Sequence, residues 1–326
     1  MKLAFATQAV DPADPVLAAT VPKLRALAAR VDELVVLADR VDRAALPANA
    51  RAHAFGARSK AERGARFAVA LARERPDAVL AHMAPVYAVL AAPLRVPVLL
   101  WFTQQRGGRL LRLAERVSRA VLTVDERSFP LPSTKIRAIG HGIDLTEFPC
   151  RSATRSPSNK LLLGLGRYAP VKGWETAVRA VAQVPDFRLA LYGPMLTEAD
   201  RRHRPELELL ARRIGAAVEF NDAVPRVRVP ELLAGAVALV NPTRGNAADK
   251  VVYEAASACV PPLAASPVFD GLLPEELRFA AGDADGLADR IRGLESLDAG
   301  IGERLRERVA ACHSVEHWAD EVLASL

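Results

Sequence analysis

Short apolar runs alternate with amphipathic segments along most of the chain, and this pattern predicts parallel α/β sheets in both halves. In the first half we expect buried strands at 2–6, 34–38, 78–82, 97–102, 120–124 and 136–139. In the second half we expect them at 161–165, 188–192, 217–220, 237–241, 261–265 and 277–280. These runs are apolar on both faces, as strands covered by helices on both sides of a parallel sheet are. The sequence therefore predicts an α/β fold with two doubly wound units.

The helical segments between the strands each carry one apolar stripe. Trp174, Ala177, Val178 and Val181 follow one another at i, i+3, i+4 and i+7, which places them on the core face of one helix. A last helix is expected over 314–325, where Val315, Trp318 and Val322 share a face. We expect this helix to pack back on the first half of the chain.

A polar, Ser-rich stretch at 151–160 interrupts the pattern and contains Pro157, so it predicts a linker. We therefore expect a first domain at 1–152, a second domain at 153–312 and a separate C-terminal helix at 313–326. In doubly wound domains, ligands bind outside the carboxyl ends of the strands. Functional residues are accordingly sought directly after the predicted strands.

Composition excludes several classes of protein. The longest apolar run, 96–102, is far shorter than the roughly 20 residues of a transmembrane helix. The first residues read as a buried strand rather than a signal peptide, because prolines and acidic residues follow at once. Cys150, Cys259 and Cys312 lie far apart without metal-ligand spacing, which fits a reducing cytoplasm.

Charge is distributed unevenly between the two halves. Residues 1–150 hold 22 Lys and Arg against 14 Asp and Glu, a net +8, whereas the remainder holds 22 against 24, a net −2. Solvated helix faces of an Arg-rich protein explain this excess, and so does an anionic partner of the first half. We do not expect nucleic acid as the partner, because the sequence shows no nucleic-acid-binding motif.

The segment after the strand at 161–165 carries the strongest chemical signal. Gly166-Arg167 ends the strand, and Lys172-Gly173 opens the next helix. Two cations beside a helix N-terminus favour an anion such as a phosphate, although two surface cations on a loop would look the same. The spacing Gly164-x-Gly166-x-x-Ala169 resembles a dinucleotide fingerprint, which we reject because the helix starts too late.

A second signal follows the strand that ends at Asn241. A Gly-containing loop leads into a helix predicted over 247–258, and Glu254 lies just over one turn into it. Free backbone amides at the helix start can hold phosphate, and Glu254 can accept hydrogen bonds from ribose hydroxyls. A glutamate that only balances the helix dipole is the alternative. A third signal is the turn with Gly140 and Gly142, which closes the first domain.

The order and spacing of these motifs resemble retaining glycosyltransferase family 4 of the group 1 glycosyltransferases, which has the GT-B fold. The resemblance rests on the following segments: AHMAPVY, LLWFTQ, SRAVLTVDERSF, IGHGIDLTEF, GLGRYAPVKGWETAVRA, LYGP, VEFNDAVPRVRVPELLAGAVALVNPT and DKVVYEAASACVPPLAA. It implies two Rossmann-like domains facing a central cleft, the first binding the acceptor and the second the nucleotide sugar. It also implies a C-terminal helix that crosses back to the first domain.

The resemblance also assigns roles to individual residues. Arg167 and Lys172 would bind the donor diphosphate and stabilise the leaving charge, and Glu254 would bind the ribose. The implied donor-binding set is Gly166, Arg167, Lys172, Val224, Asn246, Ala247, Lys250, Val251 and Glu254. No metal and no cofactor are implied beyond the nucleotide-diphosphate sugar as co-substrate, because the cations and helix ends replace the ion. The acceptor hydroxyl would attack on the face that the leaving group departs from, with the β-phosphate as the base.

Two positions depart from the family pattern. Asn246 stands eight residues before Glu254, where the family often has a second glutamate, and it could instead cap the helix. Gln104 stands where many relatives have a histidine, and its amide can hydrogen-bond but cannot act as an acid or base. His82 and His141 are other polar candidates, each with a structural role as the alternative. The predicted catalytic set is Arg167, Lys172, Gln104 and His82.

The sequence thus predicts a retaining, metal-independent, hexosyltransferase-type glycosyltransferase. The alternatives are a nucleotide-sugar-binding GT-B protein with little turnover and a nucleotide-sugar epimerase or other GT-B enzyme. Donor sugar, base and acceptor are not specified. Arginines recur on one side of a helix predicted after the WFTQ segment, at positions 106, 109, 112, 116 and 119. They predict either a solvated face or a contact with an anionic acceptor or membrane, so we expect a cytoplasmic protein with or without peripheral attachment to the inner membrane face.

Overall fold

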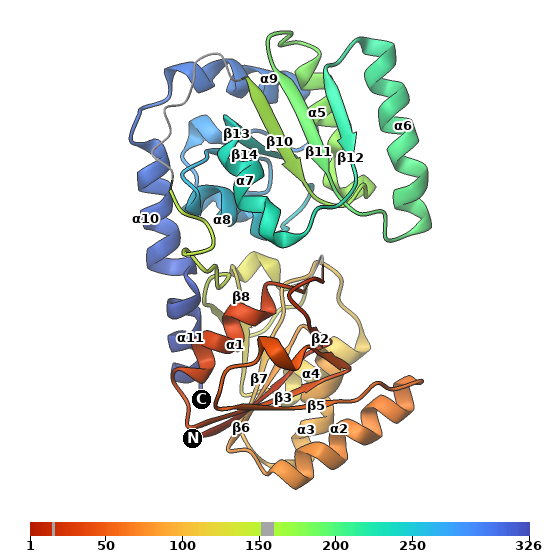
Figure 1. Cartoon of the computed structure of the whole chain (residues 1–326), viewed down its shortest axis with the longest axis vertical. Coiled ribbons are helices and arrows are strands. Elements are labelled where there is room, and N and C mark those ends of the chain that lie inside the picture. The colour runs from red at the N-terminus through yellow and green to blue at the C-terminus, as the bar shows by residue number, and fades with distance from the viewer. Residues whose placement is uncertain (15–16, 151–159) are drawn as a thin grey trace. The chain divides into compact units, whose positions relative to one another are not determined.

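The computed structural model describes residues 1–14, 17–150 and 160–326 (Figure 1). These residues form two compact units, one made of Met1–Asp144 with Cys312–Leu326 and the other of Leu145–Ala311. The division falls a few residues before the expected boundary at 152. Nearly all of the expected linker, including Pro157, lies outside the described residues.

The first unit is built on a parallel sheet with the strand order β5-β3-β1-β6-β7-β8-β9. Its strands are β1 (Lys2–Ala6), β3 (Glu33–Ala38), β5 (Ala50–Ala54), β6 (Ala78–His82), β7 (Val98–Trp101), β8 (Ala120–Thr123) and β9 (Ile136–Ala138). A small parallel pair is formed by β2 (Ala9–Val10) and β4 (Arg40–Val41). The helices of this unit are α1 (Thr20–Ala28), α2 (Lys60–Glu74), α3 (Pro85–Ala91), α4 (Arg109–Val117) and α11 (Val315–Ala324). Most residues of the central strands are fully buried, because helices cover both faces of the sheet (Figure 1).

The second unit is built on a parallel sheet with the strand order β12-β11-β10-β13-β14. Its strands are β10 (Leu161–Leu165), β11 (Arg188–Tyr192), β12 (Val218–Asn221), β13 (Ala238–Asn241) and β14 (Pro262–Ala264). Its helices are α5 (Trp174–Val181), α6 (Glu198–Ile214), α7 (Val229–Ala234), α8 (Lys250–Ser257), α9 (Ala284–Arg292) and α10 (Ile301–His313), the last of which continues into the first unit. Strand order reverses between β10 and β13, and such a switch point is where open α/β sheets bind ligands.

Eleven of the twelve expected strands are found to within one residue or so, whereas the one expected at 277–280 is wrong. That segment forms a short 3-10 helix, Glu275–Leu277, followed by a single bridge from Arg278 to Ala264. Among the described residues, three strands are not expected from the sequence: the two-residue strands β2 and β4, and β5, which reads ARAHA and lies half-exposed at the sheet edge. An edge strand needs no continuous apolar run, because only part of it is buried.

The C-terminal helix α11 belongs to the first unit and contacts α1. Trp318 is fully buried, and Arg30 of the α1 end forms an ion pair with Asp320 at 2.5 Å. Ser314, the residue directly before the helix, forms an isolated parallel β-bridge with Ile143. Over the described residues, no helix has the length and apolar character needed to cross a bilayer.

Candidate functional site

Two loops at the switch point of the second sheet pack directly on one another. The loop after β10 and the loop after β13 are joined by a hydrogen bond of 3.0 Å from the amide of Arg244 to the carbonyl oxygen of Val171. Gly173 has φ +67°, and a Cβ atom there would lie 2.5 Å from the carbonyl oxygen of Pro242. A glycine is thus required for both the backbone conformation and the close approach.

Lys172 is held at this junction by a carboxylate. Its ammonium donates to both oxygens of Asp249 at 2.6 Å, while its aliphatic stem lies beside Gly166. Asp249 also accepts from the amide of Asn241 at 2.9 Å and the hydroxyl of Thr243 at 2.6 Å. Burial alone would raise the pKa of Asp249, but the Lys172 charge and these hydrogen bonds outweigh it and hold the pKa below its ordinary value.

Arg167 is the more accessible of the two predicted cations. Its side chain is 38% exposed, and its guanidinium lies 3.6 Å from the buried carboxylate of Asp200. Asp200 forms a capping box with Thr197 at the start of α6. Burial would raise the pKa of Asp200, yet the capping hydrogen bonds and the Arg167 charge lower it overall. The long ion pair leaves Arg167 able to turn toward an anionic ligand.

Glu254, the predicted ribose-binding residue, is buried and paired with an arginine that the sequence analysis missed. Arg226 donates to Glu254 at 2.5 Å and to Glu147 at 3.0 and 2.7 Å. Its guanidinium also lies 5.3 Å from the ring of Phe148. Burial would lower the pKa of Arg226, but the two carboxylates raise it overall, so the guanidinium stays charged.

Helix α8 starts at Lys250, three residues later than expected, and the predicted capping role of Asn246 is wrong. The position before the helix is taken by Asp249, whose side chain makes no capping hydrogen bond because Lys172, Asn241 and Thr243 occupy it. The remaining predicted donor residues lie partly exposed in the loop before α8, in its first turn and in the loop after β12: Asn246, Ala247, Lys250, Val251 and Val224.

In the first unit, the two predicted catalytic side chains differ in burial. Gln104 is exposed in the loop after β7. His82 is only 5% exposed, stacks with Phe5 and Trp101 at ring distances of 5.2 and 6.3 Å, and lies 3.3 Å from the hydroxyl of Thr7. Burial, with a smaller effect of Lys23, holds its pKa well below 6.5. This packing is typical of a structural histidine, the alternative reading of His82, and the catalytic role of His82 stays a prediction.

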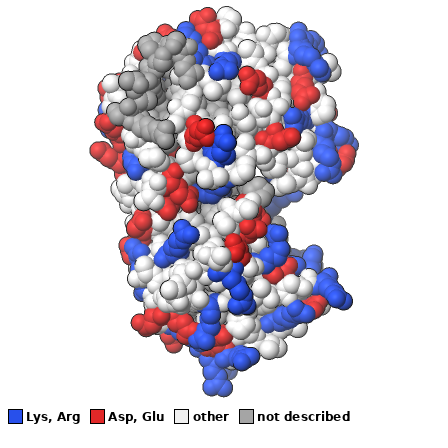
Figure 2. Space-filling model, in the orientation of Figure 1, with Lys and Arg blue, Asp and Glu red and all other residues white. Residues whose placement is uncertain are grey.

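Helix α4 carries two exposed stripes. Arg109, Arg112 and Arg116 are exposed, whereas Arg106 and Arg119 lie outside the helix, which corrects the expectation of five arginines on one helix face. Leu110 and Leu113 are 47% and 44% exposed beside them, while Leu111 and Ala114 face the core. On the face drawn in Figure 2, Lys and Arg are interspersed with Asp and Glu, so the basic excess is not gathered into one patch there.

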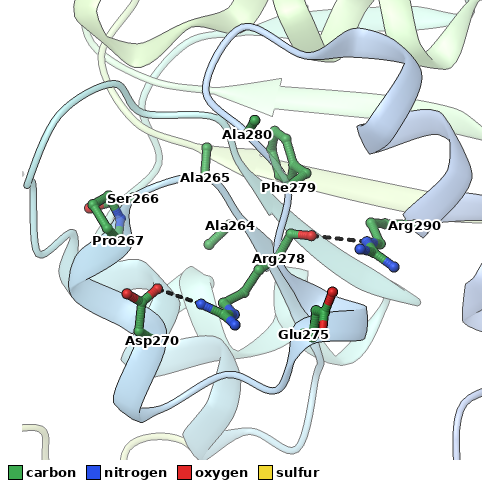
Figure 3. A pocket seen from close by; sticks show the side chains of 10 residues that line it. All are labelled: Ala264, Ala265, Ser266, Pro267, Asp270, Glu275, Arg278, Phe279, Ala280 and Arg290. Atoms are coloured by element: carbon green, nitrogen blue, oxygen red, sulfur yellow. Dashed lines mark hydrogen bonds and ion pairs between the residues drawn. The ribbon is translucent and has the colours of Figure 1, made fainter.

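A pocket of about 310 Å³ lies beyond the carboxyl end of β14 (Figure 3). Arg278 and Arg290 line it, but Arg278 is paired with Asp270, and Arg290 donates to the carbonyl oxygen of Arg278 (Figure 3). None of the predicted site residues lines this pocket. The described part of the chain also brings together no group of three His, Cys, Asp or Glu side chains that could hold a metal ion.

Two of the three cysteines are paired in the structure, although they lie far apart in the sequence. Cys150 and Cys259 form a disulfide, and Cys312 is free and exposed. The bond joins the segment of Glu147 to the residues directly after α8, although 109 positions separate the two cysteines in the sequence. The argument from scattered thiols to a reducing compartment therefore does not hold.

The sequence is similar to a glycosyltransferase family model and to curated glycosyltransferases. Residues 159–296 match the model of the family described as "Glycosyl transferases group 1". The chain is 27% identical over 242 residues to a D-inositol 3-phosphate glycosyltransferase of Mycolicibacterium paratuberculosis, a match that covers 66% of this chain and 53% of that protein. The chain thus spans about half the length of the curated relatives it matches.

Solved structures are similar over the whole chain. Sucrose-phosphate synthase (tll1590) from Thermosynechococcus elongatus has a TM-score of 0.81 at 19% identity, covering 99% of this chain and 97% of that one. Anabaena Alr3699/HepE in complex with UDP and glucose has a TM-score of 0.80 at 18% identity, covering both chains completely. At these identities the likeness establishes the fold.

Proposed function

We propose that this chain, which has the GT-B fold and whose residues 159–296 match the group 1 glycosyltransferase model, transfers a hexosyl group from a nucleotide-sugar donor to an acceptor hydroxyl. The observation that carries the proposal is the cluster at the switch point of the second sheet. There Lys172 is held in place and Arg167 remains accessible, and both follow β10. A solved structure of the same fold, Alr3699/HepE, contains UDP and glucose.

The proposed mechanism is retaining and independent of metal ions. Arg167 and Lys172 bind the two phosphates and stabilise the charge that develops as the glycosidic bond to the donor phosphate breaks. The acceptor oxygen forms its bond on the same face, and its proton passes to the departing β-phosphate. Glu254 binds the ribose, with Arg226 holding its carboxylate. This scheme needs no side chain as nucleophile, so it tolerates Asn246 and Gln104.

The first prediction is turnover in the presence of EDTA. The protein is incubated with UDP-, GDP- and ADP-sugars, and release of nucleoside diphosphate is measured with excess EDTA and after adding magnesium or manganese. We expect one donor to be hydrolysed or transferred at the same rate in all conditions, because two cations replace the ion. The anomer formed, followed by NMR, is expected to keep the donor's configuration.

Two outcomes would contradict parts of this proposal. A rate that vanishes in EDTA and returns with the metal would refute metal independence, and an inverted product would refute retention. Tight binding of a nucleotide sugar without measurable turnover would instead favour the non-catalytic binding protein that Gln104 and Asn246 suggest.

We further propose that α4 attaches the protein to an anionic membrane surface. Leu110 and Leu113 are exposed beside Arg109 and Arg112, which is the arrangement of a helix that lies in a lipid interface. Attraction between arginines and anionic lipids is screened by salt. The surface would bring a lipid-borne acceptor to the enzyme.

Binding to vesicles tests this second prediction. We expect the protein to sediment with vesicles containing phosphatidylglycerol at low salt and to be released as ionic strength rises. Replacing both Leu110 and Leu113 with serine should reduce binding at every salt concentration, whereas replacing the exposed Leu209 of α6 with serine should not. If the protein does not bind anionic vesicles at low salt, the exposed side of α4 is only a solvated surface. If its turnover of a soluble acidic acceptor falls as salt rises, the arginines serve an anionic acceptor instead of a membrane.

A further inference from the structure

The carboxylate of Asp249 connects the loop after β10 with the loop after β13 at the switch point. It accepts hydrogen bonds from Lys172 after β10, from Asn241 at the end of β13 and from Thr243 in the following loop. Asn241 and Thr243 lie within eight residues of Asp249, whereas Lys172 lies 77 positions earlier in the sequence. Asp249 is therefore the group on which the two loops converge.

These hydrogen bonds are made instead of a local one. Asp249 occupies the position before α8 where an aspartate normally accepts a hydrogen bond from a helix amide. Its side chain makes no such bond. The side chain of Asp249 therefore holds Lys172 and the two loops in place, and it does not stabilise the start of the helix.

The arrangement restricts Lys172 before any ligand arrives. A lysine side chain has a flexible four-carbon stem and loses much conformational entropy when it is fixed. Here the stem passes Gly166, and two hydrogen bonds of 2.6 Å hold the ammonium. With 17% and 18% of their side chains exposed, Lys172 and Asp249 form a largely dehydrated ion pair. The ammonium has three N–H groups, so it can bind a phosphate oxygen without leaving Asp249.

We propose that Asp249 is a positioning residue that fixes the ammonium of Lys172 to receive the diphosphate of the donor. It acts through Lys172 and does not touch the ligand. This inference rests on the proposed donor-binding function of the site. Preorganised cations stabilise phosphate charge with little reorganisation when the ligand binds.

A double-mutant cycle tests whether Asp249 acts through Lys172. Affinity for UDP, GDP and ADP is measured by calorimetry for the wild type, Asp249→Asn, Lys172→Ala and the double variant. We expect Asp249→Asn to weaken binding about tenfold in the wild-type background and less than twofold in the Lys172→Ala background. Asp249→Glu keeps a carboxylate and should retain more affinity than Asp249→Asn.

Two further variants keep the test decisive. Thr243→Val removes one hydrogen bond to Asp249 without changing any charge, and it should weaken binding in the same direction by a smaller factor. Asp270→Asn removes a carboxylate from another ion pair of the same unit, that with Arg278, and should leave affinity within twofold of the wild type. Thermal unfolding of each variant shows whether the fold is kept.

The outcomes separate this inference from the proposed function. Failure of the wild-type protein to bind UDP, GDP or ADP would overturn both. Normal binding by the wild type together with unchanged affinity in folded Asp249→Asn would overturn the positioning role alone, as would independent, multiplicative effects of the two substitutions. Should Asp249→Asn not fold, wild-type affinity in Thr243→Val would overturn it.

Discussion

Replacing Arg167 or Lys172 with alanine is expected to weaken binding of a nucleoside diphosphate by about 1.5–3 kcal/mol each, roughly 10- to 150-fold. Both side chains follow β10, the central strand of the second unit's sheet, and either substitution removes the proposed hydrogen bonds to a charged phosphate. The loss should be larger for Lys172→Ala, because it also leaves the carboxylate of Asp249, whose side chain is only 18% exposed, without its cation. Isothermal titration with the preferred nucleotide measures both values.

Arg188 provides a matched control in the same sheet. It begins β11, at the end of the sheet opposite the site, and pairs with Glu219 where both side chains are more than half exposed. Arg188→Ala removes one positive charge without removing a predicted phosphate contact, so affinity should stay near that of the wild type. Equal affinities in all three variants would refute the assignment of Arg167 and Lys172.

Arg226→Ala is expected to lower the free energy of unfolding of the second unit by about 3–5 kcal/mol. Its guanidinium forms ion pairs with both Glu254 and Glu147, and its removal leaves the buried Glu254 carboxylate uncompensated. Nucleotide affinity should fall as well, since Glu254 loses its fixed position. Urea denaturation followed by circular dichroism, and titration under native conditions, measure the two effects.

A neighbouring arginine separates this effect from simple loss of charge. Arg228 lies in the same short turn but pairs with Glu231 at the surface, where 60% and 69% of the two side chains are exposed. Exposed pairs contribute little, so Arg228→Ala should cost less than about 1 kcal/mol. Unfolding of Arg226→Ala at the same urea concentration as Arg228→Ala would show that Arg226 has no special structural role.

Most of the fold could be predicted from the sequence because the central strands are apolar on both faces. Segments such as LLLGL and AVLAH can be buried only between two layers of helices, and their boundaries follow from the pattern alone. The pattern fails where burial is partial or interrupted. The edge strand β5 has no continuous apolar run, and the apolar residues of 277–280 pack around a 3-10 turn instead of extending a sheet.

The cations of the site could be predicted because they follow a strand and precede a helix along one continuous motif. Their counter-ions could not, since each partner lies far away in the sequence. Arg226 is 28 positions from Glu254 and 79 from Glu147, and its loop offers Arg228 with the same local features. Asp249 could be recognised as polar but not as the partner of Lys172, 77 positions earlier.

The disulfide illustrates the same limit. Three cysteines permit three different pairings, and none of the spacings favours one of them. Only the folded arrangement of the second unit, where Cys150 and Cys259 have Cα atoms 5.0 Å apart, identifies the pair.

The return of α11 affects the order in which the protein can fold during synthesis. The second unit is one continuous segment, Leu145–Ala311, whereas the first unit consists of the beginning of the chain and its last residues, Cys312–Leu326. Those last residues bring Trp318, which is fully buried in the first unit. On the ribosome, Met1–Asp144 must therefore wait for Cys312–Leu326, which is translated after the whole second unit. The second unit, although begun later, has its complete sequence earlier.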